Sequence, residues 1–165
     1  MRQQLAERVT KVNTTKPPYE ERCEGPQRAQ PDLAVERSKS ITEVKILDIE
    51  KGTGPLVQPE LFITINYCMR IPDGPPEAIW RGTVVDTNKY AGGRPYRFKI
   101  GEGEFPKALY VDQEPWFRGM RVGGRRVIIL PASQAYGADP PPGVRVPKNC
   151  AVVLEVDLLF VGHLQ

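Results

Sequence analysis

From Glu43 onward, apolar and polar residues alternate with a period of two along several short segments. In the segment from Leu61 to Met69, Ile63 and Ile65 share one face and Thr64 lies on the other. Successive side chains of a β-strand point to opposite faces, so this alternation predicts half-buried strands. Segments 96–100 and 152–160 alternate in the same way, and residues 127–130 form a continuous apolar run of strand length. We therefore expect antiparallel strands with one face against a core and one face in water.

Only one segment, residues 105–120, is suited to a helix, and it contains Pro106 and Pro115. Beyond the first helical turn a proline removes a hydrogen-bond donor and clashes with the preceding turn, so we expect a short or split helix. One such helix against a curved antiparallel sheet is an α+β arrangement, and it leaves the concave face of the sheet able to hold a pocket.

Residues 1–42 have a different composition, in which charged residues, Gln, Thr and Pro outnumber large apolar side chains. Such a segment cannot bury enough surface to offset its chain entropy. We expect an extended or disordered N-terminal arm at 1–42 and a single domain at 43–165. The scattered apolar side chains of residues 1–40 suit docking to a larger protein assembly. A second interpretation is that Arg2–Lys11 forms a short basic helix of the kind that starts an organelle-targeting segment.

The charge and histidine content excludes several kinds of site. Lys and Arg total 23 and Asp and Glu total 20, for a net charge of +3. The densest basic cluster is Arg118, Arg121, Arg125 and Arg126; it is small and is interpreted as solvated charges flanking a turn, so we expect no nucleic-acid partner. A single histidine and no ligand pair at metal spacing predict no metal site, and no motif predicts a cofactor.

Three cysteines, with no C-x-x-C pair, predict a reducing compartment and no disulfide framework. We therefore expect a cytoplasmic protein. The longest apolar stretch, near the C-terminus, is interrupted by Glu155 and Asp157, and this predicts no membrane span.

Several collinear motifs resemble the FKBP family of peptidyl-prolyl isomerases. The run from Gly119 through Val122-Gly-Gly to Pro131, followed by Gln134-Ala-Tyr-Gly, resembles the family's turn, strand and Ala-Tyr-Gly motif. The segments 147–158, 52–54 and 95–101 match the family in order. The resemblance implies a five- to six-stranded antiparallel curved sheet around one short helix. It also implies an aromatic pocket that isomerises X-Pro bonds in proline-containing segments of proteins.

The resemblance also carries site residues, one position at a time. The catalytic residues that the resemblance implies are Tyr67, Asp86 and Tyr136, the last of which would donate to a ligand carbonyl. The implied substrate-binding residues are Tyr96, Phe98, Phe105, Pro106, Leu109, Val146 and Leu154.

The chain departs from the family pattern at four pocket positions. Val85 and Leu154 stand where the family has Phe, and Leu109 stands where it has a Trp at the pocket floor. Trp116 either replaces that floor or packs on the surface side of the broken helix. Pro106 stands where the family's backbone N–H holds a ligand carbonyl, and proline has no N–H.

These departures predict weakened or lost isomerase catalysis, with the domain and its arm used for protein binding. The alternative is a non-catalytic, FKBP-like structural subunit of a larger assembly. Fold alone does not choose between them.

Overall fold

The computed structural model describes residues 28–90 and 92–163. The predictions for the first part of the arm, including the basic helix at Arg2–Lys11, fall outside the described residues.

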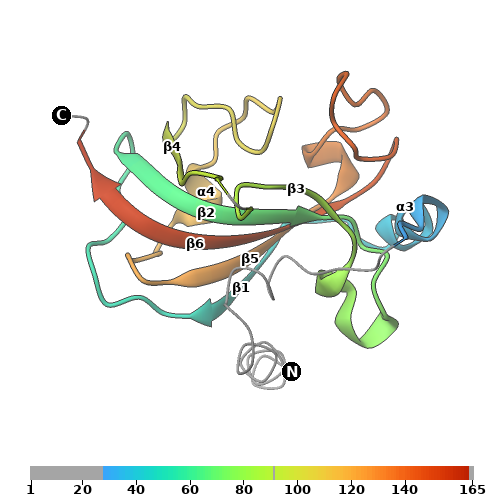
Figure 1. Ribbon diagram of the computed structural model, residues 1–165, viewed down its shortest axis with the longest axis horizontal. Coiled ribbons are helices and arrows are strands. Elements are labelled where there is room, and N and C mark those ends of the chain that lie inside the picture. Colours follow the sequence, from blue (N-terminus) through green and yellow to red (C-terminus); the bar gives the residue numbers. More distant parts are fainter. Residues whose placement is uncertain (1–27, 91, 164–165) are drawn as a thin grey trace.

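Six strands form one antiparallel sheet, with the order β1-β5-β6-β2-β3 and β4 paired to β2 (Figure 1). The strands are β1 Lys45–Glu50, β2 Phe62–Arg70, β3 Val84–Thr87, β4 Tyr96–Lys99, β5 Arg125–Leu130 and β6 Val152–Gly162. The α+β fold and the antiparallel curved sheet are therefore confirmed. Strands β2, β4, β5 and β6 lie where the hydrophobic alternation predicts them.

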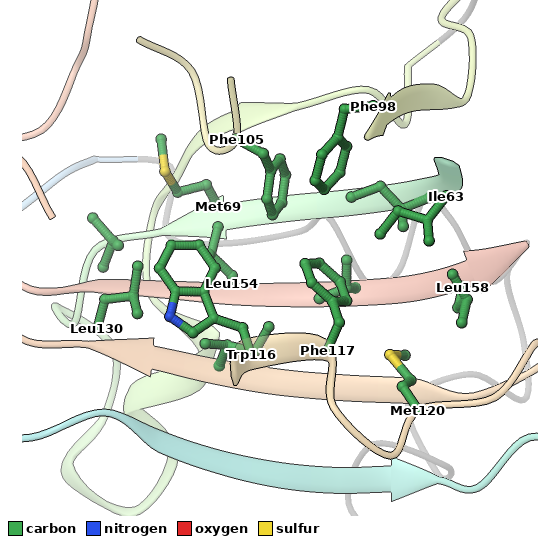
Figure 2. Close-up of a cluster of buried hydrophobic side chains, with 14 of the residues drawn as sticks. Ile63, Met69, Phe98, Phe105, Trp116, Phe117, Met120, Leu130, Leu154 and Leu158 are labelled. Atoms are coloured by element: carbon green, nitrogen blue, oxygen red, sulfur yellow. The ribbon is translucent and has the colours of Figure 1, made fainter. Parts of the chain in front are cut away.

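The core lies between the sheet and a single helical turn, α4 Glu114–Phe117. Figure 2 shows Trp116 of this turn beside Leu154 of β6, and Phe117 below the rings of Phe105 and Phe98. Pro115 is in the first turn of α4, where its missing N–H costs nothing, and the chain becomes extended at Arg118. The prediction of a short helix within residues 105–120 is confirmed.

A helix that the sequence pattern did not predict, α3 Pro31–Ser38, packs against the domain. Ala34 is fully buried, and the Ser38 hydroxyl accepts a hydrogen bond from the Ala151 N–H at 2.7 Å. Arg37 donates to the carbonyl of Gly74. Both hydrogen bonds and the burial of Ala34, with Val35 packed against the core, hold α3 to the domain.

Two shorter 3₁₀ segments, η1 Pro76–Arg81 and η2 Ala132–Gln134, complete the described elements. The helix α3 lies on the arm side of the predicted boundary at residue 42. That segment was expected to be extended or disordered, and for residues 31–38 this expectation is wrong.

The polar face of β6 was expected to face water, and the structure corrects this. Glu155 is only 8% exposed and pairs with Arg70 at 3.1 Å. Asp157 pairs with Lys89 at 2.7 Å and with Arg125 at 3.0 Å. Buried charges require such partners because desolvation of an unpaired charge is costly.

Candidate functional site

A cavity of about 620 Å³ opens beside β2, β3 and β4. Its inner wall includes Tyr67 from β2, Asp86 from β3 and Tyr96 from β4. Glu104, Phe105 and Lys107, from the segment between β4 and α4, close another side. The volume is within the usual range for ligand cavities.

Tyr67 and Asp86 form a hydrogen-bonded pair across the cavity wall. Their strands are neighbours in the sheet, and the Tyr67 hydroxyl donates to Asp86 Oδ2 at 2.9 Å. Burial, and then the negative charge of Asp86, raises the pKa of Tyr67 well above its usual range. The phenol is therefore a permanent hydrogen-bond donor and cannot act as a base at physiological pH.

Phe105 is the central ring of the aromatic cluster beside the cavity. It lines the cavity with only 1% of its surface exposed. Its centroid lies 5.2 Å from that of Tyr67, in an edge-on contact, and 5.2 Å from that of Phe98, in a stacked contact. Figure 2 shows the Phe105 and Phe98 rings side by side above Phe117. Such ring pairs stabilise beyond their buried area.

Tyr136, just after η2, uses its hydroxyl inside the protein. It donates to the backbone carbonyl of Lys107 at 2.5 Å, and the residue is 7% exposed. Burial, and then the negative charges of Asp86 and Glu104, raises the pKa of Tyr136 above its usual range. A phenol has one hydrogen to donate, and Tyr136 donates it to the Lys107 carbonyl.

The turn that presents the Lys107 carbonyl is closed by its own hydrogen bonds. The Phe105 N–H donates to the Leu109 carbonyl at 3.0 Å, and the Leu109 N–H donates to the Pro106 carbonyl at 2.9 Å. The Glu104 carboxylate accepts from the Ala108 N–H, and the Lys107 ammonium donates to the Gly143 carbonyl at 3.2 Å. These hydrogen bonds therefore hold the Lys107 carbonyl in the position where it accepts from Tyr136.

Comparison with known proteins identifies this arrangement. A family model described as FKBP-type peptidyl-prolyl cis-trans isomerase matches residues 55–159. The match spans the sheet from the segment before β2 into β6, including every residue of the cavity wall. The chain belongs to the FKBP family.

Curated relatives of this FKBP domain are longer proteins. FK506-binding protein 4 of Aspergillus fumigatus is 34% identical over 123 residues, which cover 74% of this chain and 22% of that protein. A relative from Arabidopsis thaliana, peptidyl-prolyl cis-trans isomerase FKBP16-4, chloroplastic, is 29% identical and covers 72% of this chain and 48% of that protein. The chain thus spans about a fifth to a half of the length of these relatives.

Solved structures share the fold of this FKBP domain. The crystal structure of AtFKBP13 aligns with a TM-score of 0.55 and 24% identity, covering 71% of this chain and 91% of that one. A peptidyl-prolyl cis-trans isomerase from Pseudomonas syringae pv. tomato aligns with a TM-score of 0.53 and 18% identity, covering 83% and 99%. At these identities the likeness supports the fold alone.

The FKBP site residues expected from the sequence separate into two groups. Tyr67, Asp86, Tyr96 and Phe105 line the cavity. Six others lie outside its lining and pack in or against the core: Phe98, Pro106, Leu109, Tyr136, Val146 and Leu154. Their functional roles stay predictions, since position alone does not test them.

Trp116 takes neither of the two positions expected for it. It is 5% exposed and belongs to the main core cluster, so it does not pack on the surface. It is also absent from the lining of the cavity, whose buried ring is Phe105. Figure 2 places the indole beside Leu154 and below Met69. In this FKBP domain the buried ring at the cavity, Phe105, comes from the position just before Pro106.

Sequence reasoning missed the residues that follow β3, of which Asn88 is the most important for the shape of the cavity. Its side-chain oxygen accepts from the Tyr67 N–H at 2.8 Å. Its side-chain nitrogen donates to the carbonyls of Ile65 and Arg94, both at 3.1 Å. An asparagine directly after a strand is a turn signal that was available in the sequence.

The cysteine prediction is wrong at one position. Cys68 is disulfide-bonded. Cys150 is a buried free thiol. An odd count and wide spacing did not exclude a disulfide, because pairing depends on distance in the fold.

Among the described residues, no group of three or more His, Cys, Asp or Glu side chains is able to hold a metal ion. Within the same part of the chain, no helix is long and apolar enough to cross a membrane.

Proposed function

We propose that this FKBP-type domain binds proline-containing segments of proteins in the cavity beside Tyr67 and isomerises X-Pro bonds weakly. The observation that carries the proposal is the hydrogen bond from the Tyr136 hydroxyl to the Lys107 carbonyl at 2.5 Å. The aromatic wall supports binding, and the engaged donor supports weak catalysis.

The chemistry of the reaction explains why these features matter. Rotation about an X-Pro bond has a barrier of about 18–20 kcal/mol, because the twisted amide loses its conjugation. An apolar wall and hydrogen bonds to the carbonyls of the substrate lower that barrier without a nucleophile or a metal. Phe105 and Tyr96 supply apolar wall, and the Tyr67–Asp86 pair supplies a polar edge.

The engaged hydroxyl of Tyr136 adds a cost to catalysis. A substrate carbonyl that used this donor would first have to displace the Lys107 carbonyl. The net contribution of such a hydrogen bond is about 0.5–1.5 kcal/mol, equivalent to a rate lower by roughly two- to tenfold. Pro106 has no N–H with which to hold a second carbonyl. Both features lower the rate and leave the cavity open.

A non-catalytic structural subunit of a larger assembly is the alternative, and the same engaged donor favours it. Residues 1–40 would attach the subunit to its partners. Within that segment, Ala34 and Ser38 are buried against the chain's own domain, so the partner contacts would involve mainly the residues before α3. We propose the cytoplasm as its compartment, on the wide spacing of the three cysteines. Organelle import is the alternative, and the chloroplastic relative favours it.

A protease-free assay on a Leu-Pro peptide tests the proposal. We expect a rate above the uncatalysed one and well below that of a family member that keeps the Phe and Trp rings. Asp86→Asn should lower kcat/KM more than Tyr136→Phe does, since the Tyr136 hydroxyl already serves Lys107. Glu43→Gln, an exposed carboxylate far from the cavity, is the matched control for the loss of charge.

Three outcomes distinguish the alternatives. Activity equal to that of a member with the full set of rings would contradict weak catalysis. Peptide binding without any acceleration would support the structural subunit. A loss of activity in Tyr136→Phe larger than in Asp86→Asn would show that the hydroxyl leaves Lys107 for the substrate.

A further inference from the structure

A second cavity, of about 460 Å³, lies where the end of β1 meets the turn before β5. It shares no lining residue with the cavity beside Tyr67. Its lining contains four basic side chains and two acidic ones: Lys51, Arg118, Arg121, Arg126, Asp48 and Glu50. The sequence pattern predicts solvated charges flanking a turn here, and Arg126 contradicts that interpretation because it is only 4% exposed.

The buried Arg126 guanidinium is fixed by three hydrogen bonds. Nε donates to Asp48 Oδ1 at 2.7 Å, and Nη1 donates to the carbonyls of Trp116 and Arg118, both at 2.9 Å. These carbonyls are at the end of α4, where the helix leaves them without an internal donor. Arg126 therefore has a structural role through Nε and Nη1.

The remaining nitrogen, Nη2, is turned toward Gly119. It lies 4.0 Å from the position that a Cβ at Gly119 would occupy, and Gly119 has a φ of +82° and no side chain. Within the described part of the chain, Nη2 donates to no residue, although Arg126 is nearly buried. Nη2 is therefore held in position by the bonds of Nε and Nη1, and it faces the cavity at a point where Gly119 has no side chain to cover it.

The charges around Nη2 leave the cavity attractive to an anion. Arg118 forms an ion pair with Glu114, and Asp48 forms one with Arg126. Lys51 and Arg121 are exposed at the rim. Glu50 lies 3.8 Å from Arg125, on which it is partly neutralised.

The remaining negative charge at the rim limits which anion fits. Asp48 and Glu50 would repel a doubly charged phosphate more strongly than a singly charged carboxylate. Buried Met120 adds an apolar wall, which suits the methylene groups of a glutamate side chain. The volume exceeds that of one carboxylate and leaves room for its stem.

We propose that this second cavity binds glutamate side chains of an acidic protein segment. Arg126 Nη2 is the donor to the carboxylate, held in position by the rest of its nearly buried side chain, and Lys51 and Arg121 are the rim charges that attract the segment. The carboxylate accepts from a guanidinium already held in position, so little side-chain entropy is lost on binding.

Binding of the peptide Ac-(Glu)₆-NH₂ to the full chain at low salt, measured by calorimetry and by backbone amide NMR, tests this proposal. We expect the double variant Lys51→Glu with Arg121→Glu to weaken binding more than tenfold. The matched control is Arg145→Glu with Lys148→Glu, which makes the same charge change at exposed positions outside this cavity. We expect this control to weaken binding less than threefold. In the native chain, we expect the peptide to shift backbone amide signals only in residues 48–54 and 118–126.

The outcomes separate a site from general charge attraction. Equal weakening by the two double variants would overturn the proposal, as would amide shifts spread over the whole surface. Binding of inorganic phosphate as tight as that of the peptide would overturn the carboxylate assignment. Arg126→Lys gives an independent readout: a folded variant that binds the peptide as tightly as the native chain would show that Nη2 is not the donor.

Discussion

The cavity beside Tyr67 and the second cavity of this FKBP domain differ in how the hydrogen-bond donors in and next to them are used. Beside Tyr67, the phenols of Tyr67 and Tyr136 each donate within the protein, to Asp86 and to the Lys107 carbonyl. In the second cavity, Arg126 also donates within the protein and still has Nη2 facing open space. A phenol carries one donor hydrogen and a guanidinium carries five. Burial therefore uses up a tyrosine as a ligand donor, whereas an arginine can support the fold and a ligand together.

Removing the ring beside the first cavity should give the largest effect. Phe105→Ala deletes a ring that contacts those of Tyr67, Tyr96 and Phe98. We expect the free energy of unfolding to fall by about 3–5 kcal/mol, as for other buried Phe→Ala changes. Denaturant titration measures it, with Phe160→Ala, at 46% exposed, as the control. Similar losses in the two variants would show that Phe105 does not organise the cavity wall.

Removing the buried donor of the second cavity should cost somewhat less. Arg126→Met leaves the Asp48 carboxylate and the carbonyls of Trp116 and Arg118 without this donor. We expect the free energy of unfolding to fall by about 1–3 kcal/mol, the usual cost of unsatisfied buried groups. Arg121→Met, which changes an exposed arginine of the same cavity, should stay within about 0.5 kcal/mol. A neutral Arg126→Met would mean that water satisfies those carbonyls equally well.

The macrolide FK506 provides a ligand test of the first cavity. Pro106 offers no N–H, and a lost hydrogen bond to a buried carbonyl costs about 1–3 kcal/mol, or roughly 5- to 150-fold in affinity. Calorimetry should therefore show binding weaker by roughly 5- to 150-fold than in a family member that has the N–H at this position. Nanomolar affinity would show that Pro106 has been matched to the wrong family position.

A buried thiol away from both cavities should affect the pH dependence of stability only at alkaline pH. Burial raises the pKa of Cys150 to about 11, although a hydrogen bond with Ser38 opposes the shift. The unfolded thiol ionises near its ordinary pKa of about 8.5, so its contribution to stability is complete below that pH and is lost as pH rises toward 11. Cys150→Ala should flatten the decline of stability between pH 9 and pH 11, measured by thermal unfolding. If the decline is unchanged in Cys150→Ala, other titrating groups cause it.

Much of the fold was predictable because alternation along a strand is a local property. Residues 61–69 were expected to form a strand with Ile63 and Ile65 inward, and both side chains are fully buried. Helix α3 escaped prediction because it is held by partners distant in sequence, such as Ser38 with Ala151. Asp157 was expected to face water because its neighbours alternate, but Lys89, 68 residues away, pairs with it.

The candidate site was predictable only in part. Side-chain type and family motif named Tyr67, Asp86, Tyr96 and Phe105, all of which line the cavity. The exclusion of Tyr136 from that lining could not be inferred, because its hydroxyl meets a carbonyl 29 residues away.

The sequence by itself determined the antiparallel sheet, the short helix and the family, because periodicity and collinear motifs are written along the chain. Only the tertiary structure decided which donors are already used, which ring lies at the cavity and where an arginine keeps a nitrogen facing outward. Hydrogen-bond partners are chosen by proximity in the fold, and each donor hydrogen serves essentially one strong acceptor. Tyr136 and Arg126 have the same need for partners when buried, but the number of hydrogens each can offer gives them different capacities to bind.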